Sequence, residues 1–224
     1  TREGGTGTFT CSSSTSVNNF RPRPTSKLGD IVNSGPLYVG KPGAGYSDVD
    51  HPGYKSFYTN YKDRVPMIYI GANDGMLHGF NACVPGVTAG CAAADAGKEL
   101  LVYIPSVVYE NLSRLTDKNY NANHRYFVDG SPMTADVYSS STSSWRTVLV
   151  GGLNGGGQGY YALDITNPTD TTKSAPTFAA ANAANILLWE FTSADDADMG
   201  YSHNYPQINS FTGQAMQIVK MENN

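Results

Sequence analysis

The chain has 224 residues, of which 15% are charged, and its formal net charge is −4 at pH 7. Its length is sufficient to bury a core, as one large domain or two small ones. The acidic balance disfavours binding to nucleic acid or to an anionic membrane, because both require a basic surface. No apolar run approaches the roughly 20 residues of a membrane-spanning helix, so no transmembrane segment is predicted. Many glycines and tyrosines among short apolar runs favour a β-rich fold.

The first predicted segment is a Ser/Thr/Pro-rich linker, residues 1–27. It contains no apolar signal core, so we expect an internal cut or a processed end, and the chain to be a piece of a longer protein. A strand interrupted by a turn is predicted over 29–40, and a loop over 41–53. Aromatic residues at positions 54, 57, 58 and 61 have the spacing of an amphipathic helix, which is predicted over 54–64.

Three apolar runs then predict strands over 65–71, 76–82 and 98–106, with a tight Asn-Asp-Gly turn between the first two. A short helix is predicted over 107–116, with Ser106 as its N-cap.

The remaining pattern predicts further strands. The string HRYFVDGSPMTADVYS, residues 124–139, indicates a strand, a turn and a strand. Three more strands are predicted in the strings WRTVLVGG, GGGQGYYALDI and NILLWEF. An acidic loop follows, and NYPQI, residues 204–208, is typical of the first strand of another unit.

Two stretches of the chain match each other: MIYIGANDGMLHGFNA (67–82) and VLVGGLNGGGQGYYAL (148–163). Each follows a segment with a Ser/Gly-Pro turn, which we call its lead-in segment: VNSGPLYV (32–39) before the first and VDGSPMTADV (128–137) before the second. Each precedes another apolar strand. A four-stranded antiparallel unit repeated in tandem is a propeller blade. The match pairs Gly71 with Gly152, Asn73 with Asn154, and Gly75 with Gly156.

The repeat predicts an all-β fold, a partial β-propeller with short inserted helices. We expect one blade at 28–106, a helical insert at 107–123, a second blade at 124–192 and the start of a third at 193–224. Two blades do not close a ring and would leave exposed edges. The native protein is therefore expected to contain more blades than this chain.

The glycine-rich turn between the matched strands is interpreted as structural. Asn73, Asp74 and Gly75 are expected to turn one strand into the next, because these residue types tolerate positive φ. Gly79 is expected to allow close packing within the blade.

The cysteines Cys83 and Cys91 flank a short Pro/Gly loop. A disulfide between them is predicted, which implies an oxidising compartment, and the alternative is two reduced surface thiols. A metal site there is disfavoured, because no histidine or further cysteine lies nearby in sequence. Cys11 is left over and could pair with a residue outside this chain.

The strings GDIVNSGPLYVG, YIGANDGMLHGFNA, GKELLVYIPS, HRYFVDGSP and WRTVLVGGLNGGGQGYYALDIT follow one another in an order that resembles the C-terminal domain of the PilY/PilC family. The resemblance runs from about residue 28 to 208. Members are bacterial type IV pilus biogenesis factors and tip-associated adhesins. The resemblance implies a quinoprotein-like β-propeller, with about two four-stranded blades and the beginning of a third in this chain.

The resemblance also implies a place and partners for the protein. It implies export through the periplasm to the pilus tip or outer membrane, and contact with minor pilins and with a host or abiotic surface receptor. The implied function is support of pilus assembly, twitching motility and attachment.

Several members of the family bind calcium in a D-x-D-x-N-x-x-D loop, and this chain contains no such loop. Asp48 and Asp50 lack the later acidic ligand, and the cluster Asp195, Asp196 and Asp198 fits no complete calcium loop. These five are weak metal candidates, and a solvated surface loop is the default interpretation. Calcium is therefore possible in the full-length protein, whereas we expect no cofactor in this segment.

No catalytic residues are predicted, and we expect this chain not to be an enzyme. A nucleophile elbow is missing, and GGLNGGGQG (151–159) lacks the following helix that a phosphate-binding loop needs. No zinc-ligand spacing joins the histidines, which are His51, His78, His124 and His203. The string ALDITNP…LLWEF resembles the docking motif of quinoprotein propellers, so Trp189 is expected to pack between blades. The alternatives are a pyrroloquinoline quinone-dependent redox propeller and a secreted adhesin unconnected to pili.

Overall fold

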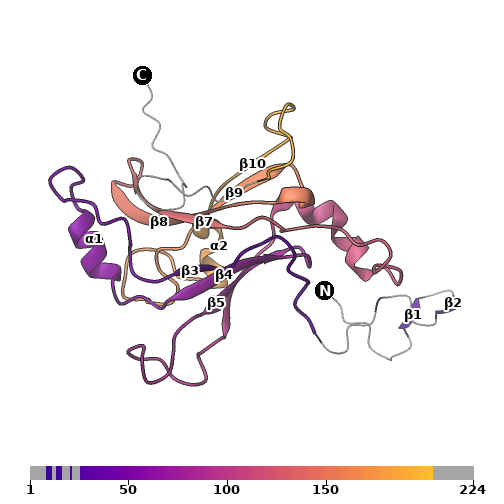
Figure 1. Cartoon of the computed structure of the whole chain (residues 1–224), viewed down its shortest axis with the longest axis horizontal. Helices are drawn as coiled ribbons and strands as arrows, with labels where there is room; N and C mark the ends of the chain where they lie inside the picture. Colours follow the sequence, from indigo (N-terminus) through magenta and orange to yellow (C-terminus); the bar gives the residue numbers. More distant parts are fainter. Residues whose placement is uncertain (1–8, 12–13, 17–20, 22–25, 204–224) are drawn as a thin grey trace.

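The computed structural model describes residues 9–11, 14–16, 21 and 26–203. These residues form two four-stranded antiparallel sheets and a separate two-stranded hairpin. Figure 1 shows the sheets side by side, with the helix α1 at one end and the pink helical segment η1 at the other. The predicted all-β fold with two four-stranded blades and short helices is confirmed.

The first sheet has the strand order β3-β4-β5-β6, so strands that are consecutive in the chain are neighbours in space. Its strands are β3 (Leu37–Val39), β4 (Met67–Ala72), β5 (Met76–Asn81) and β6 (Glu99–Tyr103). Strand β3 is much shorter than the strand predicted over 29–40. Helix α1 (Tyr54–Tyr61) lies between β3 and β4, and its predicted amphipathic character is confirmed because Tyr54, Phe57 and Tyr61 are buried.

The second sheet repeats this arrangement, with the order β10-β9-β8-β7. Its strands are β7 (Met133–Ser139), β8 (Ser144–Gly152), β9 (Gly159–Asp164) and β10 (Leu187–Thr192). The strand–turn–strand prediction over 124–139 is wrong in its first half, because 124–132 forms no strand. The polar groups of this stretch bond to the lead-in segment of the first blade instead, and Pro132 has no N–H for a ladder.

The remaining elements are short. They are β1 (Phe9–Cys11), β2 (Ser14–Ser16), the 3-10 helices η1 (Ser106–Thr116), η2 (Asn154–Gly156) and η3 (Ala180–Asn182), and helix α2 (Ala183–Ile186). Strands β1 and β2 pair as a hairpin inside the predicted linker 1–27. Ser106 is not the N-cap of η1, because Pro105 holds that position without a side-chain cap. Residues 193–203 form no strand, and residues 204–224 of the predicted third blade lie outside the described residues.

The main hydrophobic core lies between the two sheets. Its fully buried members include Tyr69 and Leu77 from the first sheet and Leu149 and Tyr161 from the second, with Val108 of η1 at one end. Each such side chain stabilises the fold by roughly 1.5–3 kcal/mol relative to an exposed position. The two blades are therefore joined by a shared apolar interface.

The outward face of β10 is apolar and exposed. Trp189 is 46% exposed and lies between Leu187 and Phe191, which are exposed on the same face of the strand. Trp189 points away from the first sheet, because its strand neighbour Glu190 bonds to the first blade. Its packing against a further blade stays a prediction, since residues 204–224 lie outside the described residues.

The connections between strands alternate between the two ends of the sheets. One end, which we call the loop face, carries the connections β3–β4, β5–β6, β7–β8 and β9–β10. The other end carries the turns β4–β5 and β8–β9 and the helix η1. In Figure 1 the loop face is the side of α1. Equivalent loops of both blades thus gather on one surface, where loops on a rigid scaffold commonly carry function.

Candidate functional site

The two lead-in segments, which the sequence repeat aligns, bond directly to each other. Asn33 donates its backbone N–H (3.1 Å) and its side-chain amide (2.6 Å) to the carboxylate of Asp129. Ser34 donates its hydroxyl to the carbonyl of Gly130 at 3.0 Å. Buried polar groups with partners of this kind specify one arrangement, because leaving them unpaired is costly. The relative position of the blades is therefore fixed by polar contacts as well as by the core.

A second polar contact joins the blades at their outer strands. The hydroxyl groups of Tyr103 and Ser106 both donate to the carboxylate of Glu190 on β10, and the Ser106 N–H donates to it at 2.8 Å. Burial is the main cause of a raised pKa of Tyr103, and the hydrogen bond to Glu190 raises this pKa further. Ser106 thus bonds across to the other blade rather than capping its own helix.

The predicted turn of Asn73, Asp74 and Gly75 between β4 and β5 is present, and among these three only Gly75 has a positive φ (93°). Asn73 is buried instead, donates to Asp30 at 3.0 Å and accepts the Phe127 N–H at 3.0 Å. The amide side chain therefore connects the residues just before the lead-in segments of both blades. Local turn chemistry does not reveal this role.

Two of the aligned glycines are required by close contacts with the backbone before β7. A Cβ at Gly71 would lie 2.2 Å from the carbonyl oxygen of Val128, and one at Gly156 would lie 1.7 Å from that of Phe127. In the second turn the residue with positive φ is Asn154, at 49°. A Cβ at Gly152 would meet the Ser202 carbonyl at 2.8 Å. The repeat thus marks equivalent positions whose crowding comes from different neighbours.

Gly79 allows close packing, as the sequence predicts. A Cβ there would lie 3.0 Å from Leu101 and 3.0 Å from the ring of Tyr69. It lies in the third strand of the blade, where the Tyr69 ring packs across it.

His78 lies between two carboxylates. Its Nδ1 is 2.5 Å from Glu99 Oε1, and its Nε2 is 3.1 Å from Asp74 Oδ1. Asp74 also accepts the Gly29 N–H at 2.7 Å. Burial alone would lower the pKa of His78, but the hydrogen bonds and charges of Asp74 and Glu99 outweigh it and raise the pKa above 6.5. His78 therefore links the turn at Asp74 to strand β6 at Glu99.

Asp136 anchors the loop face. Its carboxylate accepts hydrogen bonds from the backbone N–H groups of Gly43 (2.9 Å) and Ala44 (3.2 Å) and from the hydroxyls of Tyr54 (2.7 Å) and Thr147 (2.7 Å). Burial is the main cause of a raised pKa of Tyr54, and the hydrogen bond to Asp136 raises this pKa further. The inserted helix of the first blade is thus fixed to the second blade, and sequence reasoning missed this residue.

Aromatic side chains surround this anchor on the loop face. The ring of Trp145 lies 5.0 Å from that of Tyr54, 5.6 Å from that of Tyr46 and 5.6 Å from that of Tyr138. Its indole N–H donates to the Pro52 carbonyl at 3.0 Å. Edge-to-face contacts of this kind add stability beyond area burial. The two blades therefore share an aromatic cluster at their loop face.

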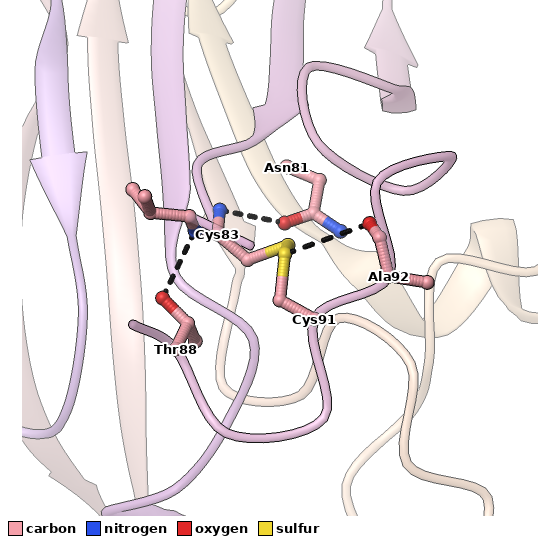
Figure 2. Close-up of a disulfide and its surroundings, with 6 residues drawn as sticks. Asn81, Cys83, Thr88, Cys91 and Ala92 are labelled. Atoms are coloured by element: carbon pink, nitrogen blue, oxygen red, sulfur yellow. Dashed lines mark hydrogen bonds between the residues drawn. A yellow bond between two sulfur atoms is a disulfide. The ribbon is translucent and has the colours of Figure 1, made fainter. Parts of the chain in front are cut away.

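The predicted disulfide between Cys83 and Cys91 is present (Figure 2), with a Cα–Cα distance of 5.8 Å. Around it, Asn81 accepts the Cys83 N–H at 2.9 Å, and Thr88 accepts the Val84 N–H at 3.0 Å. The bridge closes an exposed loop in the β5–β6 connection, which belongs to the loop face.

The structure places the metal candidates in local turns. Asp48 accepts the Lys55 N–H, Asp195 accepts the Thr192 N–H, and Asp196 accepts the Asp198 N–H, at distances of 2.8, 2.8 and 3.0 Å. Within residues 9–11, 14–16, 21 and 26–203, no three His, Cys, Asp or Glu side chains gather as a metal site would require. Metal binding at Asp48, Asp50, Asp195, Asp196 and Asp198 stays a prediction.

The amino-acid sequence was compared with models of protein families and with known proteins. The sequence matches the model of the PilY1 beta-propeller domain over residues 28–222. The chain belongs to this family. Relatives named type IV pilus biogenesis factor PilY1 include one from Pseudomonas aeruginosa, 40% identical over 198 residues, and a homologue from Xylella fastidiosa, 40% identical over 185 residues. They align with 85% and 81% of this chain.

This chain corresponds to a small part of the length of each PilY1 relative. It spans 14% of the Pseudomonas protein and 13% of the Xylella protein. Among solved structures, the crystal structure of the Pseudomonas aeruginosa PilY1 C-terminal domain is 35% identical, has a TM-score of 0.48, and matches 74% of this chain and 27% of that one. Among the described residues, no helix is both long enough and apolar enough to cross a membrane.

Proposed function

We propose that this chain is part of a type IV pilus biogenesis factor that acts at the pilus tip and supports pilus assembly, twitching motility and attachment. The observation that carries the proposal is the match to the PilY1 beta-propeller family over residues 28–222. The relatives that bear the name of pilus biogenesis factor are 40% identical to this chain. We propose a role in interaction rather than catalysis, after export through the periplasm to the cell surface.

We propose different roles for the sheets and for the loops of this chain. The two sheets and their shared core form the scaffold, and the loop face presents the inserted segments of both blades. The bridge between Cys83 and Cys91 agrees with folding in an oxidising compartment such as the periplasm. Minor pilins and a host or abiotic surface receptor are the partners we propose for these loops.

Genetics tests this function. The full-length gene is deleted, the deletion strain is complemented with the intact gene, and surface pili, twitching and attachment are scored. We expect loss of pili and twitching in the deletion strain and recovery of both on complementation. Normal pili and twitching with weakened attachment would instead assign a dedicated adhesin. Unchanged pili, twitching and attachment would overturn the proposal, and bound quinone would then be sought by absorption spectroscopy.

A further inference from the structure

A groove of about 680 Å³ opens on the loop face, where three connections meet. Helix α1 contributes Asn60 and Tyr61, the β7–β8 hairpin contributes Tyr138 and Trp145, and residues 174–176 come from the β9–β10 connection. The Tyr61 hydroxyl accepts the N–H of residue 175 at 3.4 Å, which ties two of these walls together. The groove is therefore built by both blades and does not exist in either blade alone.

One part of the groove is aromatic. Tyr138 and Trp145 are directly paired across β7 and β8, with their ring centroids 5.6 Å apart. Tyr138 is 51% exposed. The N–H of Trp145 is already bonded to Pro52, so the indole offers its ring rather than a donor. An exposed ring (Tyr138) and a half-buried one (Trp145) beside polar groups are typical of ligand pockets.

The other part is an ion pair in which Asp164 Oδ1 accepts the Thr166 N–H at 3.0 Å and Asp164 Oδ2 faces Arg146. Arg146 Nη1 lies 3.3 Å from Asp164 Oδ2, with side-chain exposures of 22% and 1%. Oδ2 of Asp164 is buried and accepts no hydrogen bond from the described residues. Among the described residues the guanidinium of Arg146 makes this ion pair and no side-chain hydrogen bond, although it has five N–H donors. The pair therefore leaves N–H donors of the guanidinium available to a ligand in the groove.

The charges in the groove cancel. Arg146 and Asp164 are the only charged residues among those that line it, and the other polar side chains are Asn60, four serines, one threonine and the tyrosines Tyr61 and Tyr138. A phosphorylated or acidic ligand would require a cluster of cations. A ligand that suits this lining is uncharged, has an apolar face for the rings, and carries many groups that both donate and accept hydrogen bonds.

We propose that this groove binds a neutral saccharide. The C–H face of a pyranose ring packs against Tyr138 and Trp145, whose ring faces carry negative partial charge. The ring hydroxyls accept from Arg146 and bond with the Asn60 amide. The biological meaning of this binding rests on the proposed attachment role, because a surface glycan is then the receptor chemistry.

Binding is tested on the purified full-length protein. It is applied to an array of neutral oligosaccharides built from hexoses, N-acetylhexosamines and deoxyhexoses, and the best ligand is then titrated by calorimetry. The variants Tyr138→Ser and Arg146→Gln remove the aromatic and the cationic contact. The matched control is Tyr109→Ser, because Tyr109 is 57% exposed on η1, at the opposite end of the sheets. Thermal melting verifies that each variant is folded.

The expected result is binding of at least one neutral oligosaccharide by the unchanged protein. Tyr138→Ser and Arg146→Gln are expected to weaken it at least about tenfold, whereas Tyr109→Ser leaves it unchanged. No saccharide bound at millimolar concentration overturns the inference, as does equal weakening by all three variants. Binding of a proline-rich peptide in place of any saccharide also overturns it.

The outcome is separable from that of the proposed function. If complementation restores pili and twitching while no saccharide binds, only the saccharide inference fails. If saccharide binds while the gene deletion leaves pili and twitching unchanged, the pilus role fails and the groove stands.

Discussion

Removing the Asp136 carboxylate should release the inserted helix α1 from the second blade. The carboxylate accepts four hydrogen bonds, two from the 43–44 backbone and one each from the hydroxyls of Tyr54 and Thr147. In Asp136→Ala all four donors lose this acceptor, and the Ala44 N–H keeps a second one, the Tyr54 hydroxyl at 2.9 Å. The backbone donors lie near the surface, where water can replace part of what is lost, whereas the two hydroxyls are buried.

The magnitude follows from those two buried groups. A hydrogen bond to a charged group contributes about 1.5–3 kcal/mol, and the contributions within one network are not additive. We therefore expect Asp136→Ala to lower the local stability of the loop face by about 3–5 kcal/mol. Asp136→Asn should cost less, about 1–2 kcal/mol, because its carbonyl oxygen can face three of the donors while its amide faces the oxygen of Thr147.

Hydrogen exchange of the Gly43 and Ala44 amides in the full-length protein measures this local opening. A loss of about 3 kcal/mol or more corresponds to exchange faster by about two orders of magnitude. The control is Asp63→Ala, since Asp63 lies just after α1 and is exposed, and its side chain makes only a 3.9 Å ion pair with Lys62 within the described part of the chain. Equal exchange rates in Asp136→Ala and Asp63→Ala would refute the anchoring role.

Three further predictions concern the other features of the blades. The pKa of His78 is raised, so its ionised form stabilises the fold fully below about pH 6.5, and this contribution is lost as pH rises through the raised pKa. The free energy of unfolding of His78→Gln, measured by urea titration, should lack this pH dependence. A pH dependence equal to that of the unchanged protein would contradict the prediction. Cys83→Ser should speed hydrogen exchange in the 83–91 loop more than it lowers the melting temperature, and a large fall in melting temperature would argue against this. Gly71→Ala should destabilise the protein by about 1–3 kcal/mol in urea unfolding, whereas Gly200→Ala, where a Cβ meets nothing within 4 Å, should not; equal effects would show that the Val128 contact is unimportant.

Most strands of the two sheets, and their order, could be predicted from the sequence. Short apolar runs bounded by Gly, Asn and Asp carry a local signal, and the internal repeat shows that the runs form two copies of one unit. The helix at 54–61 was predictable for the same reason, because its aromatic residues recur at helical spacing. The Cys83–Cys91 bridge followed from two cysteines that flank one short loop.

The polar contacts of the site could not be predicted, because their partners are far apart in sequence. Asn33 and Asp129 are 96 positions apart, and Asp136 and Tyr54 are 82 apart. Local chemistry indicates that Asn73 belongs to a turn, and this is correct, but only the fold shows that its amide holds Asp30 and Phe127. The alignment of the repeat did contain one signal, since it places Asn33 and Asp129 at equivalent positions.

The loop face is therefore a property of the pair of blades. The walls of its groove come from α1 of the first blade and from β8 and the β9–β10 connection of the second, and Asp136 and Trp145 bond across the boundary. Any change that shifts one blade against the other should alter this surface before it unfolds either sheet. Mutations at Asn33 or Asp129, far from the groove in sequence, are consequently expected to affect binding at the loop face through the packing of the blades.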